Sequence, residues 1–132
     1  MKLARNIPVL LTGAFLLYAC GKKEEAAPQA TVAQPSDPLA LGKEVYMGKG
    51  ACFTCHGNEG KGDGPAGAAL KPKPRNFAEA KWKYGTELEK VKNTIAKGSP
   101  GTSMAAYEGT LTPEEIDAVA RYVLTLGGKP IQ

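Results

Sequence analysis

Two cysteines and the only histidine of this 132-residue chain lie together, in the order Cys52-Phe53-Thr54-Cys55-His56. This spacing is typical of covalent haem attachment. Each thiol can add to one vinyl group on the same edge of a porphyrin, and the imidazole that follows can ligate the iron on its proximal face. The motif therefore predicts one haem c bound through Cys52 and Cys55, with His56 as an iron ligand.

Two other kinds of site also use a pair of cysteines separated by two residues. A zinc site would need two to three further Cys or His ligands, whereas the chain has one other cysteine, Cys20, and no other histidine. A thioredoxin-type dithiol lies at the start of a helix in a β-α-β pattern, and here glycines rather than strand-like segments flank the motif. We therefore favour haem attachment over both alternatives.

Residues 1–19 have the features of a secretory signal peptide. Lys2 and Arg5 provide the positive end, and residues 7–17 form an apolar core of about eleven residues, which is shorter than the roughly twenty residues that span a bilayer. Without Lys2 and Arg5, the number of basic residues falls from 17 to a value close to the 13 acidic residues. No basic cluster indicates nucleic-acid binding.

The leader ends in Leu17-Tyr18-Ala19-Cys20, which resembles a bacterial lipobox. We expect Cys20 to become the lipidated N-terminus of the mature protein, with more than one acyl chain for stable anchoring; the alternative is an ordinary signal peptide with a chance cysteine. The rest of the segment 20–36 is rich in Ala, Pro, Gln, Lys and Glu and lacks aromatics, so it is expected to be a disordered tether. The protein would then be exported and held at a bacterial membrane, with its folded part on the periplasmic or extracellular side.

The folded part, residues 37–132, is long enough for one small domain. A first helix should open with Asp37 as N-cap and Pro38 at its first position, and stop at Gly48. A second should open with a capping box of Thr86 and Glu89. Apolar residues then follow at helical spacing up to a glycine stop: Leu88, Val91, Ile95 and Gly98.

A last helix should start at a second capping box, formed by Thr112 and Glu115 with Pro113 between them, and end at Gly127. Its apolar stripe consists of Ile116, Val119, Ala120 and Val123. No segment alternates with period two over enough residues to predict a strand. The fold class expected is all-α, with three to four short helices.

The second iron ligand can be narrowed down by elimination. With one histidine, ligation by two imidazoles from this chain is impossible. Met1 lies in the leader and Met47 on a helix that must pass beside the porphyrin, whereas Met104 lies in a Gly/Ser/Pro loop that is free to fold across the distal face. A lone methionine more often serves core packing, but here we favour Met104 as the distal ligand over a lysine or an open site.

The ordered set of motifs resembles the class I, single-haem c-type cytochromes over about residues 38–126. The matching stretches are Cys52 to Gly57, Gly64-Pro65, Gly101-Thr102-Ser103-Met104 and the closing helix. The resemblance implies that the first and last helices cross at a close contact, for which Gly42, Tyr46 and Tyr122 are the matching positions. It also implies that a proline carbonyl, at Pro65, accepts a hydrogen bond from His56 Nδ1. Many relatives have proline after the ligand methionine, where this chain has Ala105.

A small cytochrome c fold with both axial positions filled implies a one-electron carrier rather than an enzyme, because no substrate can reach the iron. A thioether ligand favours Fe(II) and raises the reduction potential. Expected partners are a quinol-oxidising complex or dehydrogenase as donor and a terminal oxidase or reductase as acceptor, met near the membrane through the lipid anchor. Two alternatives stay open: a ligand-binding or peroxidatic haem protein with an open sixth site, and a fixed electron-transfer subunit of a larger oxidoreductase.

Overall fold

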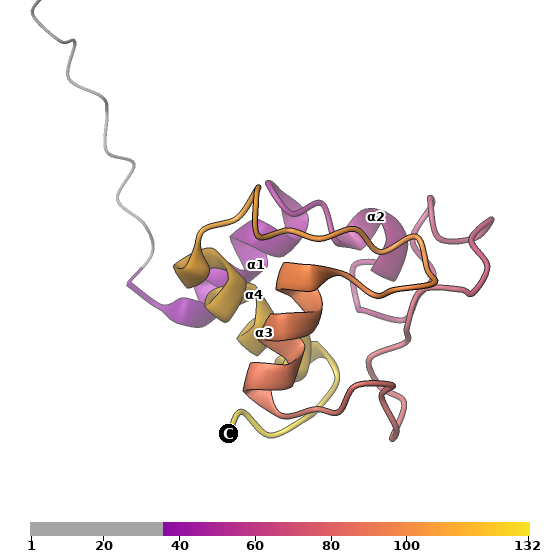
Figure 1. Ribbon diagram of the computed structural model, residues 1–132. Helices are drawn as coiled ribbons and strands as arrows, with labels where there is room; N and C mark the ends of the chain where they lie inside the picture. Colours follow the sequence, from indigo (N-terminus) through magenta and orange to yellow (C-terminus); the bar gives the residue numbers. More distant parts are fainter. Residues whose placement is uncertain (1–35) are drawn as a thin grey trace, which may run out of the picture. The chain divides into compact units, whose positions relative to one another are not determined.

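The computed structural model describes residues 36–132, and within them the chain forms four helices and no strand (Figure 1). The helices are α1 (Pro38–Met47), α2 (Phe53–His56), α3 (Leu88–Lys97) and α4 (Pro113–Leu126). The all-α prediction is confirmed. The predicted leader, Cys20 and all but the last residue of the tether lie outside the described residues.

Helices α1 and α4 cross at a point where α1 has no side chain. A Cβ atom on Gly42 would overlap the carbonyl oxygen of Ala118 and lie 2.8 Å from Cβ of Tyr122, so only glycine permits this approach. One turn further on, the rings of Tyr46 and Tyr122 meet edge to face, with 5.4 Å between their centroids and 64° between their planes. The crossing that the family resemblance implied is therefore confirmed at all three predicted positions.

The helix caps agree with the sequence signals at α1 and α4. The Asp37 carboxylate accepts a hydrogen bond from the N–H of Leu39 at 2.9 Å. Thr112 and Glu115 form the reciprocal capping box predicted for α4. Glu115 also pairs with Lys49 at 2.7 Å, which ties the chain just after α1 to the start of α4.

The capping box predicted for α3 is wrong. The N-cap of α3 is Glu87, one residue later than Thr86, and no side chain caps it. The carboxylate of Glu89, which the box would need, instead pairs with Lys92 at 2.8 Å. The predicted apolar face and the stop at Gly98 are both present.

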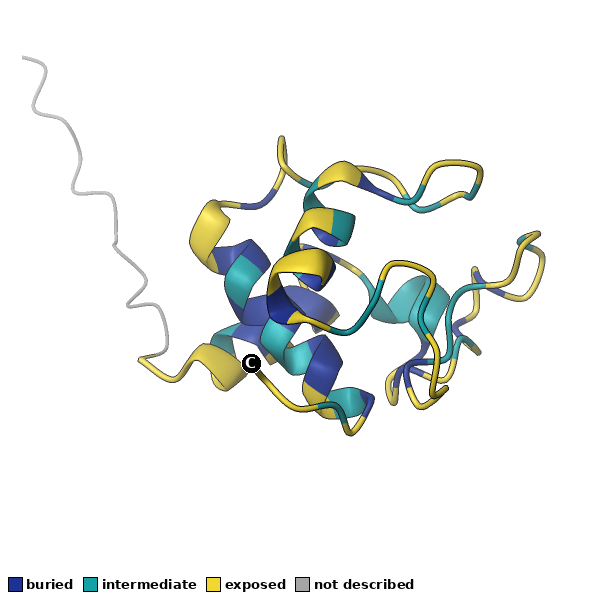
Figure 2. Ribbon diagram, turned by 60° about the horizontal axis from the view of Figure 1, so that its bottom comes forward, coloured by how far each residue is buried: buried dark blue, intermediate teal, exposed yellow. Residues whose placement is uncertain are grey.

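The core lies between α1, α3 and α4, and Figure 2 shows the buried residues concentrated in these helices. Leu88, Val91 and Ile95 of α3 face the predicted stripe of α4, and all of them are buried. Residues 57–87 contain turns but no helix. Within residues 36–132, no helix is both long and apolar enough to cross a membrane.

Candidate functional site

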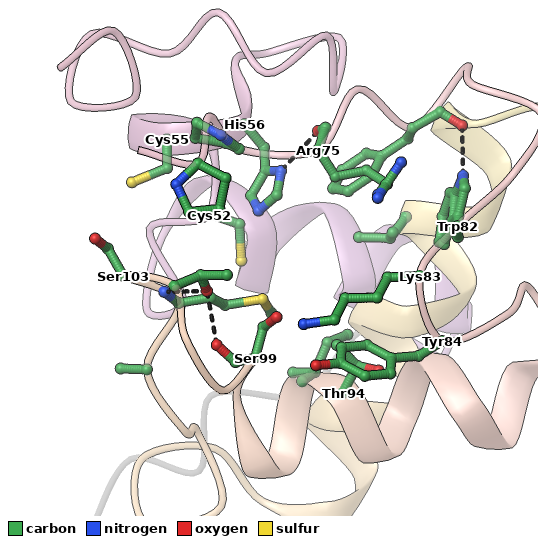
Figure 3. Close-up of a pocket in the computed structure, with 18 of the residues that line it drawn as sticks. Cys52, Cys55, His56, Arg75, Trp82, Lys83, Tyr84, Thr94, Ser99 and Ser103 are labelled. Carbon is green, nitrogen blue, oxygen red and sulfur yellow. Dashed lines mark hydrogen bonds between the residues drawn. The ribbon is translucent and has the colours of Figure 1, made fainter. Parts of the chain in front are cut away.

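A cavity of about 680 Å³ opens between α2, α3 and the loops that precede and follow α3 (Figure 3). Its volume lies within the range of sites that take small molecules or cofactors. Most of its exposed wall is apolar. All four residues predicted to hold haem and iron line it: Cys52, Cys55, His56 and Met104.

The single turn of α2 gathers the attachment motif on one side. Positions separated by three and four residues share a helix face, so Cys52, Cys55 and His56 lie together, and the His56 N–H donates to the Cys52 carbonyl oxygen at 2.9 Å. Both thiols are free and half-buried. Burial raises the pKa of Cys52 to about 11, whereas a redox dithiol works through a lowered thiol pKa. The environment of Cys52 therefore opposes the thioredoxin-type alternative.

The imidazole of His56 has one nitrogen engaged and one free. Its Nδ1 lies 3.0 Å from the carbonyl oxygen of Arg75, so Nδ1–H is the donor and the lone pair of Nε2 remains available to a metal. Burial lowers the pKa of His56, an effect that the Arg75 carbonyl opposes. The ring of Phe77 stacks on the imidazole, with 4.6 Å between the centroids and 21° between the planes. The imidazole is thus held in one orientation, neutral and ready to ligate.

The prediction that Pro65 supplies this carbonyl is wrong. Pro65 is exposed and held beside α2, because Gly64 N–H donates to Cys55 O at 3.1 Å and Ala66 N–H to Thr54 O at 2.8 Å. The carbonyl oxygen that accepts from His56 belongs to Arg75, ten residues later, in the segment that follows the glycine-rich residues 57–67.

Sequence reasoning did not find the residues that hold this returning segment. The Arg75 guanidinium pairs with Glu79 at 2.5 Å and donates to the Lys81 carbonyl oxygen at 3.0 Å. The indole N–H of Trp82 donates to the carbonyl oxygens of Phe77 and Glu79. The sequence signal that could have drawn attention to this segment is the run of Arg75, Phe77 and Trp82 directly after two prolines.

Met104 and Met47 lie in different environments, in keeping with the choice of Met104 over Met47 as the candidate iron ligand. Met104 is partly buried and lines the cavity, on a loop that returns to Ser99 through a hydrogen bond from the Ser99 N–H to the Met104 carbonyl oxygen at 3.1 Å. Met47, at the end of α1, is 39% exposed and is not among the cavity residues. Of the methionines that the structure describes, Met104 alone shares a cavity with His56.

Comparison with known proteins identifies the family. The family model for cytochrome c matches residues 39–127. The chain belongs to the cytochrome c family. This match covers all four helices apart from Pro38, the first residue of α1, and it implies that haem c is bound covalently at the Cys52–Cys55 pair.

Curated relatives of this cytochrome c are subunits of larger assemblies. The chain is 37% identical over 89 residues to the Cbb3-type cytochrome c oxidase subunit FixP of Bradyrhizobium diazoefficiens, covering 67% of this chain and 28% of FixP. It is 34% identical over 116 residues to the Cbb3-type cytochrome c oxidase subunit CcoP of Rubrivivax gelatinosus, covering 86% of this chain and 33% of CcoP. The chain thus spans about a third of the length of these relatives.

A solved structure has the same fold. The Kuenenia stuttgartiensis reducing HAO-like protein complex Kustc0457/Kustc0458 contains a chain that matches with a TM-score of 0.64 and 30% identity, over 75% of this chain and 46% of that one.

The residues of the cavity fit haem c. Two free thiols can form thioethers, an oriented imidazole offers Nε2, a thioether sulfur shares the cavity, and the wall is largely apolar. When bound, haem c supplies a one-electron Fe(III)/Fe(II) couple.

Proposed function

We propose that this cytochrome c is a one-electron carrier with a single haem c, in which His56 and Met104 are the axial ligands. The observation that carries the proposal is that the cavity is lined by the thiols of Cys52 and Cys55, by the imidazole of His56 and by the side chain of Met104. The chain has one attachment motif, which supports a single haem. With both axial positions filled, the iron changes oxidation state without binding a substrate, so the protein would transfer electrons rather than catalyse a reaction.

We further propose that Cys20 carries a lipid anchor and that residues 20–36 tether the haem domain to a bacterial membrane. The support is the Leu17-to-Cys20 tetrapeptide and the composition of the segment after it. Confinement near the membrane raises the effective concentration of the carrier at its partners. These partners would be a quinol-oxidising complex or dehydrogenase and a terminal oxidase or reductase.

A second candidate function is that of a fixed electron-transfer subunit. The relatives named FixP and CcoP are subunits of Cbb3-type cytochrome c oxidases and match most of the haem domain. A permanent interface with an oxidase would use the same haem chemistry. Purification from native membranes in mild detergent separates the two candidates: a carrier is recovered alone, and a subunit is recovered with its oxidase.

The ligation is tested by optical spectra of the purified holoprotein. Methionine sulfur bound to Fe(III) gives a weak far-red charge-transfer band, and a six-coordinate reduced protein binds CO slowly. If the wild-type protein lacks the band and binds CO rapidly, the ligand-binding alternative replaces the carrier.

The anchor is tested by fractionating cells that express Cys20→Ser. We expect the exported variant to leave the membrane fraction with its haem spectrum unchanged. If Cys20→Ser remains in the membrane after a high-salt wash, protein contacts or another segment hold the protein there.

A further inference from the structure

The loop that carries Met104 is closed on itself by hydrogen bonds that converge on Ser99. The Ser99 N–H donates to the Met104 carbonyl oxygen at 3.1 Å, and the Ser99 carbonyl oxygen accepts from the N–H and the hydroxyl of Thr102 at 3.1 and 2.7 Å. The Met104 N–H in turn donates to the Thr102 hydroxyl oxygen at 3.1 Å. Because of these bonds, a displacement of Ser99 also displaces the backbone that carries the thioether.

Two side chains from a different segment reach this loop at the cavity. The Lys83 ammonium donates to the Pro100 carbonyl oxygen at 3.4 Å and lies 4.8 Å from the centre of the Tyr84 ring. The polar neighbours Lys83 and Ser99 lower the pKa of Tyr84. In Figure 3 the ends of Lys83 and Tyr84 both point toward Ser99.

Few hydrogen bonds attach this loop to the rest of the chain, so the loss of one should loosen it. Among residues 36–132, the bond from Lys83 to Pro100 is the only hydrogen bond that links residues 99–104 to another part of the chain. The next attachment is at Tyr107, whose N–H donates to the carbonyl oxygens of Ile95 and Ala96. The loop is therefore fixed at its two ends on α3 and steadied between them by the bond from Lys83.

We propose that Lys83 and Tyr84 form a clasp that holds the Ser99–Met104 loop over the cavity and so controls how readily Met104 leaves the iron. The proposal rests on the proposed ligation by Met104. Both are positioning residues, since they act on the ligand through the loop that carries it.

The first test measures ligand exchange in the holoprotein. Cyanide can bind Fe(III) only after the sixth ligand dissociates, so its limiting rate of binding reports how often Met104 leaves. We expect Lys83→Met to bind cyanide about two- to tenfold faster than wild type, the factor that one net hydrogen bond represents. Tyr84→Phe should also bind it faster, because the variant removes the polar end of Tyr84 beside Ser99. The far-red band should survive in both variants, because the loop still closes at equilibrium.

Lys81→Met is the matched control. Lys81 is an exposed lysine of the same segment that neither lines the cavity nor contacts the loop, so its loss removes the same charge without loosening the clasp. Cyanide binding in Lys83→Met and Tyr84→Phe at the rate of Lys81→Met would overturn the proposal. A shift in reduction potential in Lys83→Met with no change in the cyanide rate would also overturn it, because Lys83 would then act on a haem carboxylate instead.

The second test does not depend on the iron–sulfur bond. Hydrogen exchange of the Ser99 amide reports opening of its bond to Met104, and we expect it to be about two- to tenfold faster in Lys83→Met. The comparison is made both with Met104 and in a Met104→Ala background. If wild type lacks the far-red band, the proposed ligation fails while this exchange still decides the clasp. Unchanged exchange in Lys83→Met would refute the clasp even where the ligation holds.

Discussion

The two walls of the cavity are built in different ways. On the proximal wall, the chain that follows α2 returns to it through backbone hydrogen bonds, and His56 is fixed by the Arg75 carbonyl and by the Phe77 ring. On the distal wall, Met104 lies on a loop that bonds mainly to itself. The fold thus presets the imidazole of His56, whereas it holds Met104, the other proposed axial ligand, on a loop with few bonds to the rest of the chain.

The largest effect is expected from Cys52→Ala/Cys55→Ala, which removes both thiols that attach the haem to the proximal wall. A domain of this size buries little surface on its own, and a cavity of about 680 Å³ left without its cofactor is far larger than the void from a side-chain truncation. We expect a largely unstructured chain. Far-UV circular dichroism measures this, and native-like helical signal in the haem-free variant would contradict it.

Met104→Ala should change the chemistry of the distal wall while haem stays attached. Among the methionines that the structure describes, the variant removes the one that shares the cavity with His56. Water or lysine in its place favours Fe(II) less than a thioether does. We expect a lower reduction potential, loss of the far-red band and rapid CO binding. These are measured by redox titration and CO mixing.

Met47→Ala is the control for that substitution, because Met47 is 39% exposed and outside the cavity. It should keep the band and the potential. If Met47→Ala loses them and Met104→Ala keeps them, the ligand assignment is reversed.

Gly60→Ala should show how little freedom the proximal wall allows. Gly60 has φ of +71°, and a Cβ there would overlap the Phe77 ring that stacks on His56. The left-handed conformation costs about 1–2 kcal/mol and overpacking about 1–3 kcal/mol, so we expect a loss of roughly 2–5 kcal/mol. Thermal unfolding of the holoprotein gives the value.

Gly101→Ala is the matched change on the distal wall and should have the smallest effect. Gly101 has φ of +79°, but a Cβ there would meet nothing within 4 Å. The backbone penalty of about 1–2 kcal/mol is partly offset by the reduced entropy of the unfolded chain. We expect a fall in Tm of roughly 4–8 °C. A larger fall than in Gly60→Ala would show that the distal loop is the more constrained wall.

Sequence patterns predicted the parts of the fold that depend on side-chain identity. Asp37 and the Thr112–Glu115 box cap their helices through side-chain oxygens, and Gly42 is required because no other residue fits. The placement of Cys52 and His56 on one side of α2 follows from their spacing alone.

The parts that were missed depend on the backbone or on irregular chain. Every residue has a carbonyl, so no pattern distinguishes Arg75 from Pro65 as the acceptor for His56. Lys83 and Tyr84 lie in a segment without periodicity, so no pattern places Lys83 beside Pro100 in the loop that follows α3. The box predicted at Thr86 fails because α3 begins one residue later, with Glu87 as its N-cap, so Glu89 does not stand at the third helical position.

The crossing of α1 and α4 also has a consequence for the order of folding. The helices that begin and end the domain are each other's partners, so Tyr46 has no aromatic neighbour until Tyr122 has been synthesised. Closing a loop of this length carries an entropic penalty that shorter contacts avoid, and such non-local contacts slow folding. The structure that half-buries Cys52 and Cys55 therefore cannot be complete before α4 has packed against α1. Until then both thiols are accessible for attachment of the haem.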